Sequence, residues 1–171
     1  MTTRNNSFYK IVDASTWDIA EANSIALGGH LVTINDADEN AFIRQILEDN
    51  NKVSSWIGYK YDSTSDSWSW QDGSNSTYTN WDSVYSQPDI SINSTYGLEY
   101  YGSLITGISS HPYYSSWGGN GGTWHDTFNS GNDFALSVGL AEVPLSYFSI
   151  SDLTITEGES GNVTISRTGG T

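Results

Sequence analysis

Short β-type runs and two segments of helical periodicity alternate along the first part of the chain. Phe8 to Val12 combines aromatic and β-branched residues, which is typical of a strand. Ser15 to Asp18 matches a capping box, so we predict a helix that opens there and closes at Gly28. The apolar residues from about Asp36 to Leu47 recur at helical spacing and predict a second helix.

The middle of the chain predicts two more strands and then a long irregular region. One strand begins at Trp56, and a returning strand carries Trp70 in an alternating pattern. Beyond Gly73, regular structure is expected to stop for most of the way to Glu99, and a second irregular stretch runs from Gly107 to Gly122. Loops longer than about 12 to 15 residues are usually functional or disordered, and we favour function here.

The last part of the chain divides into two segments of different character. Leu136 to Leu145 is predicted to be an edge strand that returns to pair with Phe8 to Val12 and brings the ends of the domain together. We therefore expect one main domain over residues 1–145 and a separate short segment over residues 146–171.

Charge narrows the classes of partner. The chain has 20 acidic and 6 basic residues, a formal net charge of −14, which repels phosphate backbones and anionic lipid headgroups. We therefore expect no nucleic-acid partner, and no apolar run approaches the roughly 18 residues of a membrane-inserting helix. Residues 1–7 lack the apolar segment of a signal peptide, so the chain is expected to be a piece of something longer.

Oxygen-bearing side chains are spaced as a calcium site requires. They lie in Gln87-Pro88-Asp89, at Glu99, and in Trp124-His125-Asp126. Ca²⁺ takes 6 to 8 oxygen ligands at about 2.3 to 2.6 Å, and carboxylates and amides from separate loops supply them. The alternative for Gln-Pro-Asp alone is an ordinary turn, because Pro presets φ and Asp bonds its own backbone.

These motifs occur in an order that resembles the C-type lectin-like domain from about Phe8 to Leu145. The resemblance implies an α+β fold with two helices, a mixed and antiparallel sheet and a long irregular loop region. The matching residues are, in order, Trp17, Ala20, Gly28 to Ile34, Glu39 to Ile43, Trp56-Ile57-Gly58, Trp68-Ser69-Trp70, Asp72-Gly73, Tyr78, Asn80-Trp81, Gln87-Pro88-Asp89, Trp124, Asp126 and Ala141-Glu142.

The resemblance also assigns a site. It implies that Gln87, Asp89, Glu99 and Asp126 bind Ca²⁺ and the hydroxyls of a sugar, and that the peptide before Pro88 is cis. Within the family, Gln-Pro-Asp in place of Glu-Pro-Asn is associated with galactose-type sugars, because the exchange of acid and amide reverses the order of donor and acceptor.

Two departures from the family stand out. His125 is also a candidate metal- and sugar-binding residue, at a position where asparagine is common in the family, although imidazole suits Zn²⁺ or Cu²⁺ better than Ca²⁺. It either turns away and leaves a site completed by water, or bonds to the ligand and makes binding depend on pH, or marks a site that no longer binds sugar. The chain also has no cysteine, so Ser24 and Ala141 stand where a family disulfide would join the first helix to the last strand; this favours a bacterial origin.

Two further segments carry hypotheses. Tyr114 and Trp117 lie among small residues between Glu99 and Trp124, and either stack on a sugar ring or pack on the domain as a lid. Residues 146–171 resemble the opening strands of a Calx-beta type domain, cut short. Because a lone hairpin is marginal in water, we expect this segment to be frayed or to dock on the main domain.

The sequence thus predicts a calcium-dependent, galactose-type carbohydrate-binding domain of a larger secreted or cell-surface adhesin. The alternative is a lectin-like scaffold without sugar binding that acts as a protein interaction module, and a third possibility is a structural spacer. Catalysis is not expected, because the chain has three histidines, no Gly-x-Ser-x-Gly elbow and no phosphate loop.

Overall fold

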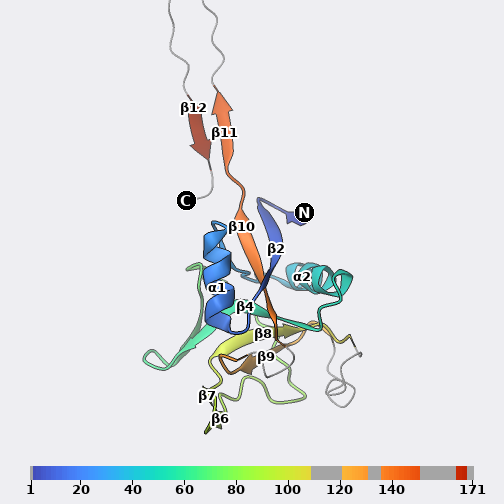
Figure 1. The fold of residues 1–171 in the computed structure, drawn as a ribbon, viewed down its shortest axis with the longest axis vertical. Coiled ribbons are helices and arrows are strands. Elements are labelled where there is room, and N and C mark those ends of the chain that lie inside the picture. The colour runs from blue at the N-terminus through green and yellow to red at the C-terminus, as the bar shows by residue number, and fades with distance from the viewer. Residues whose placement is uncertain (1, 109–120, 131–135, 151–164, 169–171) are drawn as a thin grey trace, which may run out of the picture.

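A computed structural model of the protein describes residues 2–108, 121–130, 136–150 and 165–168. These residues form two helices and an open, mainly antiparallel sheet, which confirms the predicted α+β class. None of the described helices is both long enough and apolar enough to cross a bilayer. Helices α1 and α2 lie on either side of the paired strands β2 and β10 (Figure 1).

The main sheet is built around the last strand of the domain. Strand β10 pairs antiparallel with β2 and parallel with β4, so it lies inside the sheet rather than at the predicted edge. The pairing of β10 with β2 was predicted. The pairing of β10 with β4 and with β3 (His30–Leu31) was not. In spatial order the strands are β1 (Thr2–Arg4), β2 (Ser7–Asp13), β10 (Val138–Pro144), β4 (Ser54–Asp62), β8 (Tyr101–Ile105) and β9 (Trp124–Thr127), and β5 (Ser67–Trp70) pairs with β4.

Both helices begin near the residues that the sequence indicated, although Thr16 caps α1 rather than Ser15, the first residue of the predicted capping box. In α1 (Trp17–Ala26), the hydroxyl of Thr16 accepts a hydrogen bond from the backbone N–H of Ile19 at 3.2 Å. In α2 (Ala37–Asp49), the carboxylate of Asp36 accepts one from the N–H of Glu39 at 2.7 Å. Helix α1 ends just before Gly28, which has a φ of 88° that glycine adopts readily.

Close packing joins α1 to the sheet where the family has a disulfide. Ser24 and Ala141 are both fully buried. A Cβ added to Gly139 would lie 2.8 Å from the Cβ of Ala20 and 2.5 Å from a methyl group of Leu31, so glycine is needed for α1 and β3 to approach β10. Side-chain volume is therefore tightly specified at this contact.

Aromatic side chains gather in the core around Tyr59. Trp70 and Trp124 are buried, and both rings pack against Tyr59, with centroids 4.3 and 6.0 Å from it. Trp68 and Trp81 are partly buried and pack on the same cluster. The long loop therefore packs on this aromatic cluster through Trp81.

The segment after residue 145 pairs with itself. Strand β11 (Tyr147–Ile150) is antiparallel to β12 (Ile165–Thr168), and the two form a separate sheet that extends beyond the end of β10 (Figure 1). The division into two domains and the Calx-beta resemblance stay predictions.

Two carboxylates share one hydroxyl between α2 and β10. The Tyr9 hydroxyl lies 3.0 Å from Oε1 of Glu39 and 3.1 Å from Oε1 of Glu142. A phenol has one proton to donate, so it cannot satisfy both carboxylates as a donor. Burial, and then the charge of Glu39, raise the pKa of Glu142 above its ordinary value.

This arrangement predicts that Glu142 makes stability fall as the pH rises. Because its folded pKa is raised, the native state holds more protons than the unfolded state above the ordinary pKa of 4.5, and the group costs stability once it ionises in the fold. In EDTA, urea unfolding should therefore show that the free energy of unfolding of Glu142→Gln, relative to that of wild type, is greater at pH 7 than at pH 5. The same difference at both pH values would contradict this account.

Candidate metal centre

A short hairpin brings two acidic residues of the long loop together. Strands β6 (Ile92–Asn93) and β7 (Gly97–Leu98) pair antiparallel between Asp89 and Glu99. At the base of the hairpin, the backbone N–H of Ser91 lies 3.2 Å from a carboxylate oxygen of each acid. The N–H of Glu99 donates to the carbonyl of Ser91 at 3.2 Å. The hairpin therefore closes the stretch between the two carboxylates.

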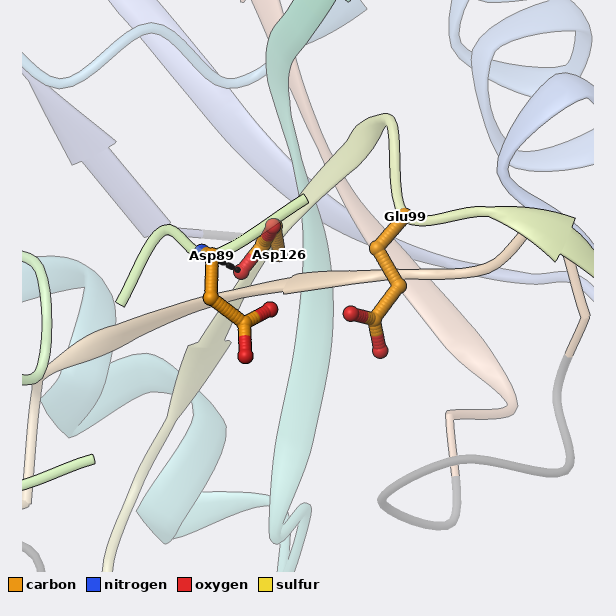
Figure 2. A group of neighbouring side chains, drawn as sticks. All are labelled: Asp89, Glu99 and Asp126. Carbon is orange, nitrogen blue, oxygen red and sulfur yellow. Dashed lines mark hydrogen bonds between the residues drawn. The ribbon is translucent and has the colours of Figure 1, made fainter. Parts of the chain in front are cut away.

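The third carboxylate comes from the sheet and fastens the loop to it. Asp126 lies in β9 and is 1% exposed. Its carboxylate accepts hydrogen bonds from the backbone N–H of Asp89 at 3.3 Å and of Ile90 at 2.7 Å. Figure 2 shows the Asp126 carboxylate next to the backbone of Asp89, and the carboxylates of Asp89 and Glu99 facing one another. The loop ligands are therefore positioned by a buried residue of the core.

The geometry of this group fits Ca²⁺. One ligand oxygen from each of Asp89, Glu99 and Asp126 lies within 4.8 Å of the other two. Two oxygens on opposite sides of a Ca²⁺ ion, each about 2.4 Å from it, are about 4.8 Å apart. Hard carboxylate oxygens without sulfur or nitrogen donors also favour Ca²⁺ over transition metals.

Gln87 lies beside the three carboxylates. Its side-chain Oε1 accepts a hydrogen bond from the backbone N–H of Asp126 at 3.2 Å. The peptide between Gln87 and Pro88 is cis, as predicted. The fold therefore brings together all four ligands implied by the family resemblance. Asp89 is exposed, Gln87 and Glu99 are partly exposed, and Asp126 is buried.

Electrostatics favour a cation at this position. Burial raises the pKa of Asp126, although hydrogen bonds from the backbone N–H groups of Ile90 and Asp89 oppose the shift. The neighbouring charge of Asp89 raises it further. A divalent cation would relieve this repulsion among carboxylates in a chain whose formal net charge is −14.

His125 is not part of this group. Successive side chains of a strand point to opposite faces, and the His125 ring lies on the face away from Asp126. It is 3% exposed, and its Nε2 lies 3.2 Å from Oδ2 of Asp82. Because a carboxylate only accepts hydrogen bonds, Nε2 is the donor. Of the three interpretations of His125, this geometry favours the one in which it turns away from the metal.

Asp82 is the residue that the sequence did not single out. It is 1% exposed and accepts hydrogen bonds from the N–H of Val84 at 2.9 Å and the hydroxyl of Thr123 at 3.2 Å, in addition to His125. It therefore joins the start of the proline loop to β9. An Asp before a Ser-Val turn is common, and its partners lie about 40 positions away, so no local pattern identifies this role.

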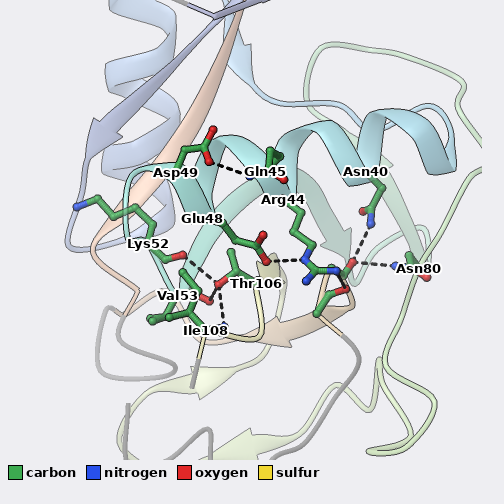
Figure 3. A network of polar contacts seen from close by, with 12 residues as sticks. Asn40, Arg44, Gln45, Glu48, Asp49, Lys52, Val53, Asn80, Thr106 and Ile108 are labelled. Carbon is green, nitrogen blue, oxygen red and sulfur yellow. Dashed lines mark hydrogen bonds and ion pairs between the residues drawn. The ribbon is translucent and has the colours of Figure 1, made fainter. Parts of the chain in front are cut away.

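Helix α2 fixes the start of β9. The side-chain amides of Asn40 and Asn80 donate to the carbonyl of Gly122 at 2.9 and 2.7 Å, and Arg44 donates to that of Gly121 at 3.0 Å. Figure 3 shows Asn40 and Arg44 reaching from the helix toward this point, with Glu48 holding the guanidinium of Arg44. The position of Asp126 thus depends on the helix as well as on the sheet.

The two aromatic residues predicted to contact a sugar, Tyr114 and Trp117, lie outside the described residues. Their part in binding stays a prediction.

Calcium should stabilise the fold through Asp126. At a calcium concentration of 100 times its dissociation constant, binding to the native state adds about 2.7 kcal/mol to the free energy of unfolding. Calorimetry should show an increase in melting temperature that Asp126→Asn abolishes. Asp49→Asn is the control, because Asp49 is exposed at the end of α2 and bonds to Gln45 alone among the described side chains. A calcium-induced shift of equal size in Asp126→Asn would contradict the assignment.

His125 should make the fold less stable at mildly acid pH. Burial lowers its pKa below the ordinary value of 6.5, although the hydrogen bond and the charge of Asp82 act in the opposite direction. The unfolded chain therefore binds a proton that the native state does not, and stability is lost as the pH falls below about 6.5. Urea unfolding from pH 7.5 to 5 should show this loss relative to His125→Asn, which does not titrate. A constant difference between the two proteins would contradict it.

Comparison with known proteins places this geometry in a family. The family model described as the Lectin C-type domain matches residues 13–104, more than half of the chain, and includes Gln87, Asp89 and Glu99. A type-2 ice-structuring protein of Brachyopsis segaliensis is 38% identical over 74 residues, 43% of this chain and 42% of that protein. A subunit of a snaclec coagulation factor IX-binding protein of Protobothrops flavoviridis is 40% identical over 73 residues, 39% of this chain and 57% of that one. The chain thus spans less than two thirds of these relatives.

Solved structures share the fold at low identity. The mouse scavenger receptor C-type lectin carbohydrate-recognition domain has a TM-score of 0.61 at 23% identity and covers 84% of this chain and 93% of its own. A calcium-independent type II antifreeze protein has a TM-score of 0.58 at 22% identity, with 84% and 90% covered. From the family match and these folds, the chain belongs to the C-type lectin domain family.

Proposed function

We propose that this domain binds a neutral glycan with the help of one Ca²⁺ ion held by Gln87, Asp89, Glu99 and Asp126. The observation that carries the proposal is the convergence of three carboxylates within 4.8 Å, from a loop hairpin and a core strand. Asp89 is exposed and Glu99 partly exposed, so an ion held there faces the solvent on one side and is accessible to a ligand.

The ion and its ligand residues would act together on a pair of sugar hydroxyls. When bound, Ca²⁺ supplies open coordination positions for two neighbouring hydroxyl oxygens. The carboxylates of Asp89 and Glu99 accept hydrogen bonds from hydroxyl groups, and the amide of Gln87 can donate one. Buried Asp126 sets where these groups stand, since it holds the backbone of Asp89 and Ile90.

A galactose-type ligand is proposed from the order of these groups. Gln87 places an amide on the side of Pro88 where the Glu-Pro-Asn motif of the family has a carboxylate, and Asp89 places a carboxylate where that motif has an amide. Oε1 of Gln87 accepts a hydrogen bond from the N–H of Asp126, and its NH₂ donates one hydrogen to the carbonyl of Tyr85 at 3.5 Å. The second hydrogen of the NH₂ is the donor for a ligand hydroxyl. Asp89 can only accept.

The setting proposed for this activity is extracellular. Calcium is abundant there, and a cysteine-free domain can fold in that compartment without disulfide formation. We propose that the domain is a module of a larger secreted or cell-surface adhesin.

A protein ligand is the second candidate function. Ile92 is 79% exposed and Val84 is 71% exposed, on the loops that flank Asp89. Exposed apolar side chains of this kind also occur at protein contact surfaces. Relatives named for ice structuring and for factor IX binding are similar to this chain, and a shared fold does not fix the ligand.

A glycan array separates the two functions. In calcium, wild type should bind galactose-terminated glycans in preference to mannose-terminated ones, and EDTA should abolish binding. Asp89→Ala should weaken it by at least about tenfold, because it removes a metal ligand. Asp49→Ala should have no effect, because this carboxylate lies on α2 outside the metal centre. Binding to a protein partner that survives EDTA, with no glycan bound, would contradict the proposal and support the interaction module.

A further inference from the structure

A pocket lies on the hairpin of β4 and β5, and its lining includes Tyr100, the residue after Glu99. Its volume is about 390 Å³, in the lower part of the range of about 300 to 1,000 Å³ that small-molecule sites occupy. Tyr61 and Tyr100 form its aromatic part, and Gln71, Asp62 and Lys60 are among its polar lining residues.

The aromatic wall of the pocket is held rigidly. The rings of Tyr61 and Tyr100 are 5.3 Å apart between centroids, inclined by 41°, and both are partly exposed. Tyr61 also packs on Trp68 at 5.7 Å, and Trp68 packs on Trp81 at 4.8 Å. The hydroxyl of Tyr61 donates to Asp66, which fixes the ring. A preorganised aromatic surface loses little entropy when a ligand stacks on it.

The polar lining suits a neutral, hydroxyl-bearing ligand. Gln71 offers both an amide donor and an acceptor, and no described residue bonds to its side chain. Asp62 still has acceptor capacity beyond its bonds from Thr64 and Ser65. The ammonium group of Lys60 lies over the rings of Trp17 and Tyr101, at 5.0 and 5.1 Å. With its one cation engaged there and a carboxylate in the lining, the pocket disfavours anions.

The backbone links the pocket to the metal centre at Tyr100. Tyr100 directly follows Glu99, so their Cα atoms are about 3.8 Å apart. The N–H of Tyr61 donates to the carbonyl of Tyr100 at 2.9 Å, which joins the hairpin to this point. The lining of the pocket therefore begins one residue after the candidate ligand Glu99, on the path of a chain of sugar rings that starts at the metal.

We propose that this pocket binds a second ring of the same glycan, with the apolar C–H face of the sugar against Tyr61 and Tyr100 and its hydroxyls on Gln71 and Asp62. The inference rests on the proposed function, because the terminal residue of that glycan occupies the metal centre. It makes the domain selective for oligosaccharides rather than for single sugars.

Isothermal titration in calcium tests the proposal with two probes, galactose and a linear galactotetraose. Wild type should bind the tetraose more tightly than galactose. Tyr61→Ala and Tyr100→Ala should each weaken the tetraose about three- to tenfold, the range expected for loss of an aromatic stack, and leave galactose unchanged. Tyr100→Phe is the matched control, because it keeps the ring, loses no hydrogen bond to a described residue and should keep the affinity.

The outcomes separate this inference from the function on which it rests. Equal affinity of wild type for the two probes, or an undiminished advantage of the tetraose in both alanine variants, overturns the second subsite and leaves the metal-dependent site intact. Failure of wild type to bind galactose in calcium contradicts the proposed function itself. Melting temperatures of the variants identify any that do not fold, and having two aromatic variants keeps the test decisive.

Discussion

One buried carboxylate organises the functional face of this domain. Asp126 stands on a core strand and accepts hydrogen bonds from two consecutive backbone N–H groups of the proline loop, those of Asp89 and Ile90. A carboxylate buried in this way is costly unless its hydrogen bonds are made. The same bonds that satisfy Asp126 therefore fix the loop at Asp89, and the hairpin that begins there brings Glu99 back beside it.

The fold reaches this precision without disulfides. Rings around Tyr59 pack together in the core, and Asn40 and Arg44 of α2 hold the strand that carries Asp126. Gly139 lets α1 approach β10 closely, at the contact where the family resemblance implies a disulfide. Packing and buried hydrogen bonds thus replace a cross-link, as expected for a domain long enough to bury a core.

Local patterns in the sequence predicted most of the elements. The helix starts near Ser15 and Asp36 were predicted because capping depends on one side chain and its near neighbours, although the cap of α1 is Thr16. The edge position of β10 was wrong, because strand order depends on pairing between segments far apart in the chain. For the site, Gln87, Asp89, Glu99 and Asp126 came from ordered motifs. The contact between His125 and Asp82 was not predicted from the sequence. Strand alternation turns the His125 ring away from the metal ligands, and Asp82 lies 43 positions earlier in the chain.

The central claim is that separate loop and strand oxygens enclose one divalent ion. A crystal structure determined in calcium, with anomalous diffraction to identify the metal, tests it most directly. The account predicts one Ca²⁺ ion with oxygens of Asp89, Glu99 and Asp126 about 2.3 to 2.6 Å away. Calcium-saturated crystals in which these carboxylates bind only water, or in which the ion lies elsewhere, would contradict it.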